Sequence, residues 1–266
     1  HVKHLEQTFA ILEQFNMKLN PTKCSFGISA GKFLGYMVTK RGIDASLDQI
    51  RTIINLQPPK SRHDVQKLTG RVVALNRFIA RSSERCKPFY DLLRKSKDFQ
   101  WTEEHNKAFE ELKSYLTSPP LLAKVEKGDP LSLYVSVAEF TISAVLVKEI
   151  DGQQHPVYYI SKCLNDAESR YSIIEKLVYS LVQACIKLKH YFEDHQITVK
   201  TNYPIRAILR KPDLAGRMNK WSIILSTYKI KYEPRTTIKS QALADFVADF
   251  SPDQEERASQ EVNMLT

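Results

Sequence analysis

The chain has 266 residues, which is long enough for one large or two ordinary domains, and we expect two. Its formal net charge of +9 favours a polyanionic partner, of which RNA and DNA are the commonest, over a merely basic surface. Four scattered cysteines without a CxxC pair argue against a zinc site or a disulfide framework, and no apolar run approaches the ~18 residues of a membrane span, so we expect an intracellular protein without a membrane partner.

The first 45 residues predict one helix and two short strands. A run of apolar residues at helical spacing ends at Asn20-Pro21, and we expect this helix to pack on a sheet. The apolar residues of the run are Val2, Leu5, Phe9, Leu12 and Phe15. Strands are expected at residues 23–28 and 32–39, with Gly35 placed where the backbone turns or approaches another group closely.

Two helices follow in the sequence. The first, at residues 48–55, ends before Pro58-Pro59, because a residue that precedes proline is pushed out of the helical region. The second begins at Ser61, an N-cap with Asp64 three positions on, in the manner of a capping box. Its apolar stripe consists of Val65, Leu68, Val72, Leu75 and Ile79. This spacing predicts one continuous helix with a single buried face.

The other face of the second helix is expected to be cationic. Four residues fall together at ~100° per residue: Lys67, Arg71, Arg77 and Arg81. Residues 60–98 hold eleven Lys or Arg against four Asp or Glu, whereas an ordinary solvated helix face mixes the two signs. Because Lys and Arg spaced along one helix can track successive phosphates, we predict that these four residues bind a nucleic-acid backbone.

A further helix is predicted to begin at Thr102. Thr102 is a suitable N-cap, and the acidic residues Glu103 and Glu104 lie in the first turn, where the helix dipole favours them. The apolar pattern ends at Ser118-Pro119-Pro120. This double proline is the predicted domain boundary.

The second part of the chain predicts a mixed sheet. Apolar and polar residues alternate in two strands with a turn between them over residues 131–149. Further strands are expected at residues 155–161 and 196–201 with a long helix at 168–192 between them, and then helices at 204–209, 218–226 and 241–249 and a strand at 227–234. The order of strand, strand, strand, helix, strand and helix is the layout of the ribonuclease H-like fold.

Several ordered motifs give this chain a family resemblance. Phe33-Leu34-Gly35 and Gly42-Ile43 are followed by QPPKSRHDVQKLTGRVVALNRFI (57–79), FQWTEEHNKAFEELKSYLTSPPLL (99–122), HPVYYISKCLNDAESRYSIIEK (155–176) and SQALADF (240–246). This series of motifs resembles the Pol polyprotein of gypsy-type LTR retrotransposons, and its sequence is most similar to plant elements. The resemblance covers residues 1–250 and, with the absence of an initiator methionine, implies a piece of a longer protein.

The resemblance implies a domain order. Residues 1–45 are expected to be the end of the reverse transcriptase palm, 46–118 a mostly helical thumb, 119–250 a ribonuclease H-like connection or tether domain, and 251–266 a polar tail or linker. The fold class is then α/β, or α+β overall. The implied partners are RNA, DNA, RNA–DNA hybrid and neighbouring Pol domains, in cytoplasmic particles or the nucleus.

Two departures from the family pattern concern catalysis. The Y-x-D-D turn of the polymerase site precedes His1, so we expect no polymerisation by this fragment and no cofactor, although the parent polymerase would need Mg²⁺. Ribonuclease H chemistry requires two divalent metals held by converging carboxylates. At the positions of these acids the sequence reads Ser136, Leu177 and Asn202, and only Asp245 keeps the carboxylate.

Neighbouring acids are not placed to substitute. Glu139 points to the opposite face if the strand of Ser136 continues, and Glu175 lies about 200° around the helix from Leu177. We therefore expect a non-catalytic domain that binds and positions primer–template. Two alternatives stay open: an active ribonuclease H that hydrolyses hybrid with an unorthodox divalent-metal site, and a protein–protein module without a nucleic-acid role.

Overall fold

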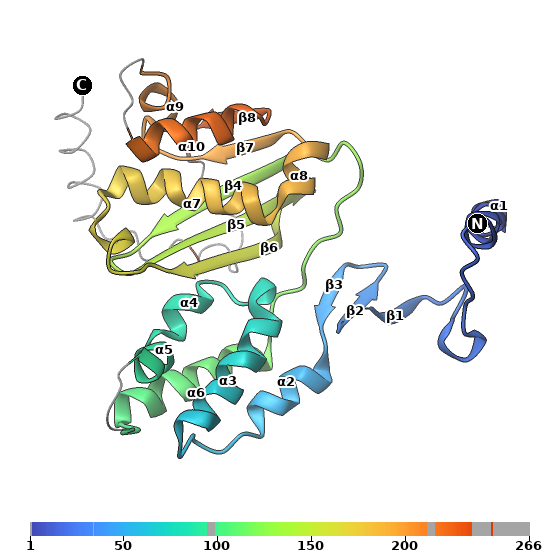
Figure 1. Ribbon diagram of the computed structural model, residues 1–266, viewed down its shortest axis with the longest axis horizontal. Helices are drawn as coiled ribbons and strands as arrows, with labels where there is room; N and C mark the ends of the chain where they lie inside the picture. Colours follow the sequence, from blue (N-terminus) through green and yellow to red (C-terminus); the bar gives the residue numbers. More distant parts are fainter. Residues whose placement is uncertain (1, 34, 95–98, 212–215, 236–245, 247–266) are drawn as a thin grey trace.

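The computed structural model describes residues 2–33, 35–94, 99–211, 216–235 and 246. Figure 1 shows three consecutive parts: an N-terminal segment that extends away from the rest, a layer of helices, and a sheet covered by further helices. None of the helices within the described residues is long and apolar enough to cross a membrane.

The N-terminal segment contains one helix and a small antiparallel sheet. Its elements are α1 (Val2–Gln14), the 3-10 turn η1 (Pro21–Lys23), β1 (Ala30–Phe33), β2 (Tyr36–Thr39) and β3 (Ile43–Ala45). The helix is confirmed, but no residue of α1 is buried, so its predicted packing on a sheet is wrong. The strand predicted at 23–28 is also wrong, because the Asn20 side chain accepts from the Thr22 N–H (3.0 Å) and starts a 3-10 turn instead. The single strand predicted at 32–39 is wrong, because the chain turns at Gly35 (φ 83°) and forms the antiparallel pair β1 and β2. The turn at Gly35 itself is confirmed.

The helical layer comprises six short elements. They are α2 (Leu47–Ile54), α3 (Arg62–Leu75), η2 (Asn76–Phe78), α4 (Ser82–Arg85), α5 (Lys87–Arg94) and α6 (Glu103–Thr117). The Ser61 hydroxyl caps α3 by accepting from the Asp64 N–H (3.2 Å), and the Asp64 carboxylate accepts from the Lys60 N–H (3.2 Å). The predicted continuation of this helix through Ile79 is wrong, because α3 ends at Leu75. Because the helix breaks there, Phe78 and Ile79 are buried in the core that the helices share with the sheet.

The five-stranded sheet has the order β6-β5-β4-β7-β8. Its strands are β4 (Leu131–Val137), β5 (Thr141–Ile150), β6 (Gln153–Cys163), β7 (Ile197–Lys200) and β8 (Ile230–Glu233), of which β4, β5 and β6 are antiparallel and β7 and β8 run parallel to β4. The flanking helices are η3 (Glu168–Arg170), α7 (Ile173–Lys187), α8 (Lys189–Asp194), α9 (Ile205–Ile208) and α10 (Gly216–Ser226). The predicted mixed sheet with flanking helices is confirmed. The single helix predicted at 168–192 is divided into η3, α7 and α8 because Ser172 and Glu175 form a capping box that starts a new helix.

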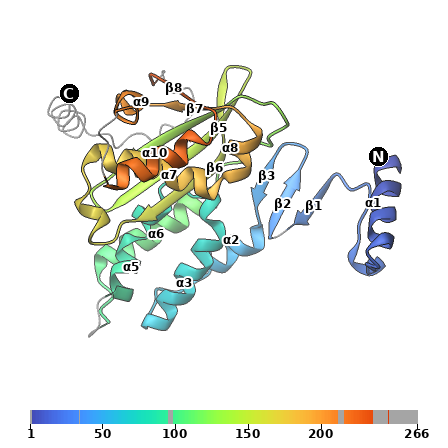
Figure 2. The same cartoon turned by 45° about the horizontal axis from the view of Figure 1, so that its top comes forward.

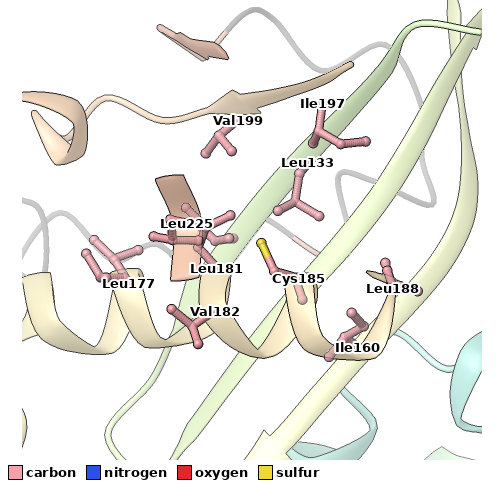
Figure 3. Packing of buried hydrophobic residues seen from close by; sticks show 14 of the residues in the cluster. Leu133, Ile160, Leu177, Leu181, Val182, Cys185, Leu188, Ile197, Val199 and Leu225 are labelled. Atoms are coloured by element: carbon pink, nitrogen blue, oxygen red, sulfur yellow. The ribbon is translucent and has the colours of Figure 1, made fainter. Parts of the chain in front are cut away.

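Both faces of the sheet are buried. On one face, α7 and α10 lie across the strands (Figure 2), and Leu133, Ile197 and Val199 meet Leu181 and Cys185 of α7 (Figure 3). On the other face, a second core joins the sheet to the helical layer. This second core includes Tyr134, Val145 and Tyr159 from the strands and Val72, Phe78, Ile79 and Phe89 from the helices.

Candidate functional site

Two of the four predicted nucleic-acid-binding residues lie on α3, one turn apart. Lys67 is exposed, whereas Arg71 is half-buried and its Nη1 donates to the carbonyl oxygen of Thr52 at 2.8 Å. Thr52 lies in the last turn of α2, where carbonyls have no partner within the helix and the dipole favours a cation. Arg71 therefore ties α3 to the end of α2 and leaves Lys67 as the more accessible charge.

The other two lie beyond the end of α3. The Arg77 guanidinium lies over the rings of Tyr36 (5.0 Å) and Tyr158 (4.6 Å), so it joins the small sheet to β6 by cation–π contacts. Arg81 has a left-handed backbone (φ 54°) and its Nε donates to Glu84 Oε2 at 2.8 Å. The predicted single cationic face is wrong, because α3 ends before both residues. Whether all four residues bind nucleic acid stays a prediction.

Gly70 lies between Lys67 and Arg71 on the exposed side of α3. A Cβ atom built at this glycine would meet nothing within 4 Å, so packing does not require the glycine there. A glycine inside a helix costs roughly 1 kcal/mol relative to alanine. Val73, three residues on, is 55% exposed, so the exposed side of α3 carries an uncharged strip next to Lys67.

The ends of three parallel strands carry the positions at which the family pattern has acids. Tyr134 of β4 is level with Lys200 of β7, which is level with Glu233 of β8. Extending this register by two residues places Ser136, Asn202 and Arg235 in one row. The Asn202 Oδ1 accepts from the Arg235 N–H (3.0 Å), and Arg235 Nη2 donates to the Val135 carbonyl oxygen (3.0 Å). The structure thus brings two of the predicted positions together and places Arg235, which no local pattern singles out, beside them.

Leu177 belongs to a different surface. It is fully buried in the core between α7 and the sheet together with Val135 and Val137. Because side chains alternate along a strand, Ser136 projects from the other face of β4. The structure does not bring Leu177 into the row of Ser136 and Asn202.

Nearby charged groups already have structural partners. The Glu175 carboxylate accepts from the Ser172 N–H (3.0 Å) and completes the capping box of α7. The buried Lys176 donates through Nζ to the Glu139 carbonyl oxygen (2.8 Å), just beyond the end of β4. Near the end of β4, the two side chains that donate to backbone carbonyl oxygens, Lys176 and Arg235, are both cations.

These residues do not fit a pair of divalent metals. Three of the four family positions are neutral, the cation Arg235 lies at the end of the row, and Asp245 falls outside the described residues. Over the part of the chain that the structure describes, no group of three or more His, Cys, Asp or Glu side chains could hold a metal ion. No step of hydrolysis can be derived from this arrangement.

One polar cluster has no local sequence signal. Lys162 Nζ lies 2.6 Å from Glu168 Oε1, the Tyr179 hydroxyl donates to the same oxygen (2.5 Å), and Lys162 also contacts that hydroxyl. The ring of Tyr179 stacks on Trp221 (5.2 Å between centroids). The cluster joins β6, η3 and α7, and because its residues come from three elements, spacing alone could not reveal it. Its position against Trp221 indicates a structural role.

Comparison with protein families gives residues 101–199 a match to the RNase H-like domain found in reverse transcriptase. Among curated proteins, the transposon Tf2-3 and Tf2-4 polyproteins of Schizosaccharomyces pombe are each 26% identical over all of this chain. The chain spans 21% of the length of these relatives. The resemblance to retroelement polyproteins is confirmed, whereas the gypsy type and the likeness to plant elements stay predictions.

Solved structures support the same fold. A foamy viral protease-reverse transcriptase in complex with RNA/DNA hybrid superimposes with a TM-score of 0.71 at 22% identity, over 90% of this chain and 34% of that chain. The complex with double-stranded DNA of the dRH form gives a TM-score of 0.70 at 21% identity, over 90% of this chain and 44% of that one. The likeness covers the helical layer and the sheet together, not the sheet alone.

Proposed function

We propose that this chain is the thumb and ribonuclease H-like part of a retroelement reverse transcriptase, and that it binds and positions primer–template without hydrolysing it. In this proposal residues 1–45 are the end of the palm, 46–118 the thumb and 119–250 the connection. The observation that carries it is the fold likeness over 90% of the chain to reverse transcriptases whose structures contain double-stranded DNA or RNA/DNA hybrid. Neighbouring Pol domains would complete the protein.

The proposed contact is the exposed side of α3. Lys67 supplies an accessible charge, Arg71 a second charge fixed against α2, and Gly70 a shallow surface that lets a duplex backbone approach closely. Arg77 and Arg81 are assigned to folding, because their guanidinium groups already lie against Tyr158 and Glu84. Lys67 and Arg71 carry positive charge one turn apart on α3, which suits contacts to successive phosphates.

The proposal of a non-hydrolytic domain rests on the former acid positions. Neutral side chains at Ser136 and Asn202, and a buried leucine at 177, leave little to hold two Mg²⁺ ions against their hydration. The charge of Arg235, whose Nη2 donates to the Val135 carbonyl oxygen, would repel a metal further. Active ribonuclease H is the competing reading, but none of the contacts among the described residues favours it.

The test measures binding and cleavage with the full chain. Replacing Lys67 and Arg71 together with alanine should weaken binding to hybrid duplexes of every sequence to a similar extent. The slope of log affinity against log salt should flatten by up to about 0.9 per lost phosphate contact. The control is Lys220→Ala with Lys231→Ala, which removes the same charge from exposed positions on α10 and β8.

Three results would contradict the proposal. An unchanged salt slope in a folded Lys67/Arg71 variant would move the contact surface away from α3. Robust Mg²⁺-dependent cleavage of the hybrid by the unmodified chain would support the alternative hypothesis of an active ribonuclease H. If the chain neither binds nor cleaves the hybrid, the protein–protein module is the hypothesis that is left.

A further inference from the structure

Arg235 occupies the end of the row that begins at Ser136. Its side chain crosses β7 to reach β4, where Nη2 donates to the Val135 carbonyl oxygen at 3.0 Å. Its backbone N–H donates to Asn202 Oδ1 at 3.0 Å. One residue thus joins the C-terminal ends of β4, β7 and β8.

The bond to Val135 has a structural reason. The parallel pairing of β4 with β7 ends at Tyr134 and Lys200, so the next carbonyl along β4 lies past the last pair of the ladder. A buried carbonyl without a donor is costly, and the half-buried Arg235 supplies the donor. The guanidinium therefore holds a fixed place beside Ser136, where it also brings a permanent positive charge.

This charge determines what an acid in the row would do. A carboxylate at position 136 would lie next to the guanidinium that bonds the Val135 carbonyl oxygen, and one at position 202 would accept from the Arg235 N–H as the Asn202 amide does. A charge-assisted hydrogen bond to arginine is short and strong. The acid would then be neutralised by the chain itself. A divalent cation would have to displace that pair and accept the nearby positive charge.

We infer that Arg235 is an internal cation that closes this row to divalent metal, so that restoring carboxylates at Ser136 and Asn202 does not restore a metal site while Arg235 is present. The inference rests on the proposed non-hydrolytic function, since it explains how the row stays closed. It assigns Arg235 a role in positioning the strand ends and none in catalysis.

The test uses three variants of the full chain and Mn²⁺ as the probe, measured by calorimetry and by electron paramagnetic resonance. Ser136→Asp with Asn202→Asp should show no specific Mn²⁺ binding. Adding Arg235→Gln, which keeps a hydrogen-bond donor without the charge, should give saturable binding at least tenfold tighter. Adding Arg235→Ala in place of Arg235→Gln should do the same, and circular dichroism verifies folding in each case.

Thermal melting gives a second readout. The two restored acids should raise or keep the melting temperature while Arg235 can pair with them, and Arg235→Gln in that background should lower it until Mn²⁺ is added. Equal Mn²⁺ affinity with and without Arg235 would overturn the inference, as would absence of binding in both triple variants. Salt-dependent binding of hybrid by the single Arg235→Gln variant should match the unmodified chain, so failure here is distinguishable from failure of the proposed function.

Discussion

The N-terminal segment and the five-stranded sheet differ in the burial of their large apolar side chains. In the segment, Phe15 is 68% exposed and Phe33 65% exposed, and α1 has no buried residue. In the sheet, Tyr134 and Tyr159 are buried on the face towards the helical layer, and Leu133 and Val135 on the face towards α7. Several large apolar side chains exposed in one segment are a feature of an interaction surface. The sheet is thus covered on both faces, by α7 and by the helical layer, whereas α1 leaves its apolar side chains uncovered, as our proposal of a palm remnant requires.

The sharpest test of this comparison is a matched pair of phenylalanine substitutions. Phe78 is fully buried between the helices and the sheet, and Phe78→Ala should lower the free energy of unfolding by about 3–5 kcal/mol through lost burial and a residual cavity. Phe15→Ala should change it by less than about 0.5 kcal/mol. Urea denaturation followed by tryptophan fluorescence measures both. A comparable loss from Phe15→Ala would mean that the segment is packed in solution.

A second pair tests the former acid positions. Leu177→Glu places a carboxylate in the apolar core under α7 and should cost about 2 kcal/mol or more. Ser136→Asp should cost little, because Ser136 is half-buried and lies beside Arg235. Chemical denaturation of both variants checks the difference. Equal costs would show that Ser136 and Leu177 share one environment, against the alternation of β4.

The polar cluster under Trp221 predicts a pH dependence. Burial raises the pKa of Glu168, but hydrogen bonds from Lys162, Tyr179 and the Asn165 N–H outweigh it and hold the pKa below its ordinary value of 4.5. Burial lowers the pKa of Lys162, but its bonds to Glu168 and Tyr179 outweigh burial and raise the pKa above 10.5. A carboxylate with a depressed folded-state pKa contributes stability above its unfolded pKa and loses it as the pH falls through the folded value.

Glu168→Gln should therefore lower the free energy of unfolding near neutral pH by about 1 kcal/mol, after allowance for the partial exposure of Lys162. The difference from the unmodified chain should shrink as the pH falls below 4.5. Denaturation between pH 7 and 3 measures it, and Glu126→Gln, at an exposed carboxylate, is the control. If the difference in the free energy of unfolding does not depend on pH, the ion pair of Glu168 with Lys162 is not its cause.

The order of the elements could be predicted from the sequence, because the alternation in β4 and the capping residues Ser61 and Thr102 are local signals. The end of α3 could not be predicted, because Ile79 continues the apolar spacing and only its place in the shared core shows that the chain has turned. The role of Arg235 depends on the register of three strands and on a bond to a residue 100 positions away. No pattern of spacing contains such information.

The smallest expected effect concerns α3. One side of this helix is buried and the other is exposed, as the sheet and the N-terminal segment are. Leu68 and Val72 are fully buried on one side, whereas on the other Gly70 has open space around it. Gly70→Ala should raise the free energy of unfolding by about 0.5–1 kcal/mol, because alanine has the higher helix propensity and meets no neighbour.

The same substitution should weaken binding to hybrid duplex if a backbone approaches Gly70 closely, because the added methyl group would stand beside Lys67 on the exposed side of α3. Ala74→Ser, one turn further along the same exposed side, is the control for a general change of that surface. Denaturation and a salt titration of binding give the two readouts on one protein. Higher stability with weaker binding would identify the glycine as a residue kept for the ligand at a cost to the helix. Higher stability with unchanged binding would place the duplex elsewhere on the helical layer.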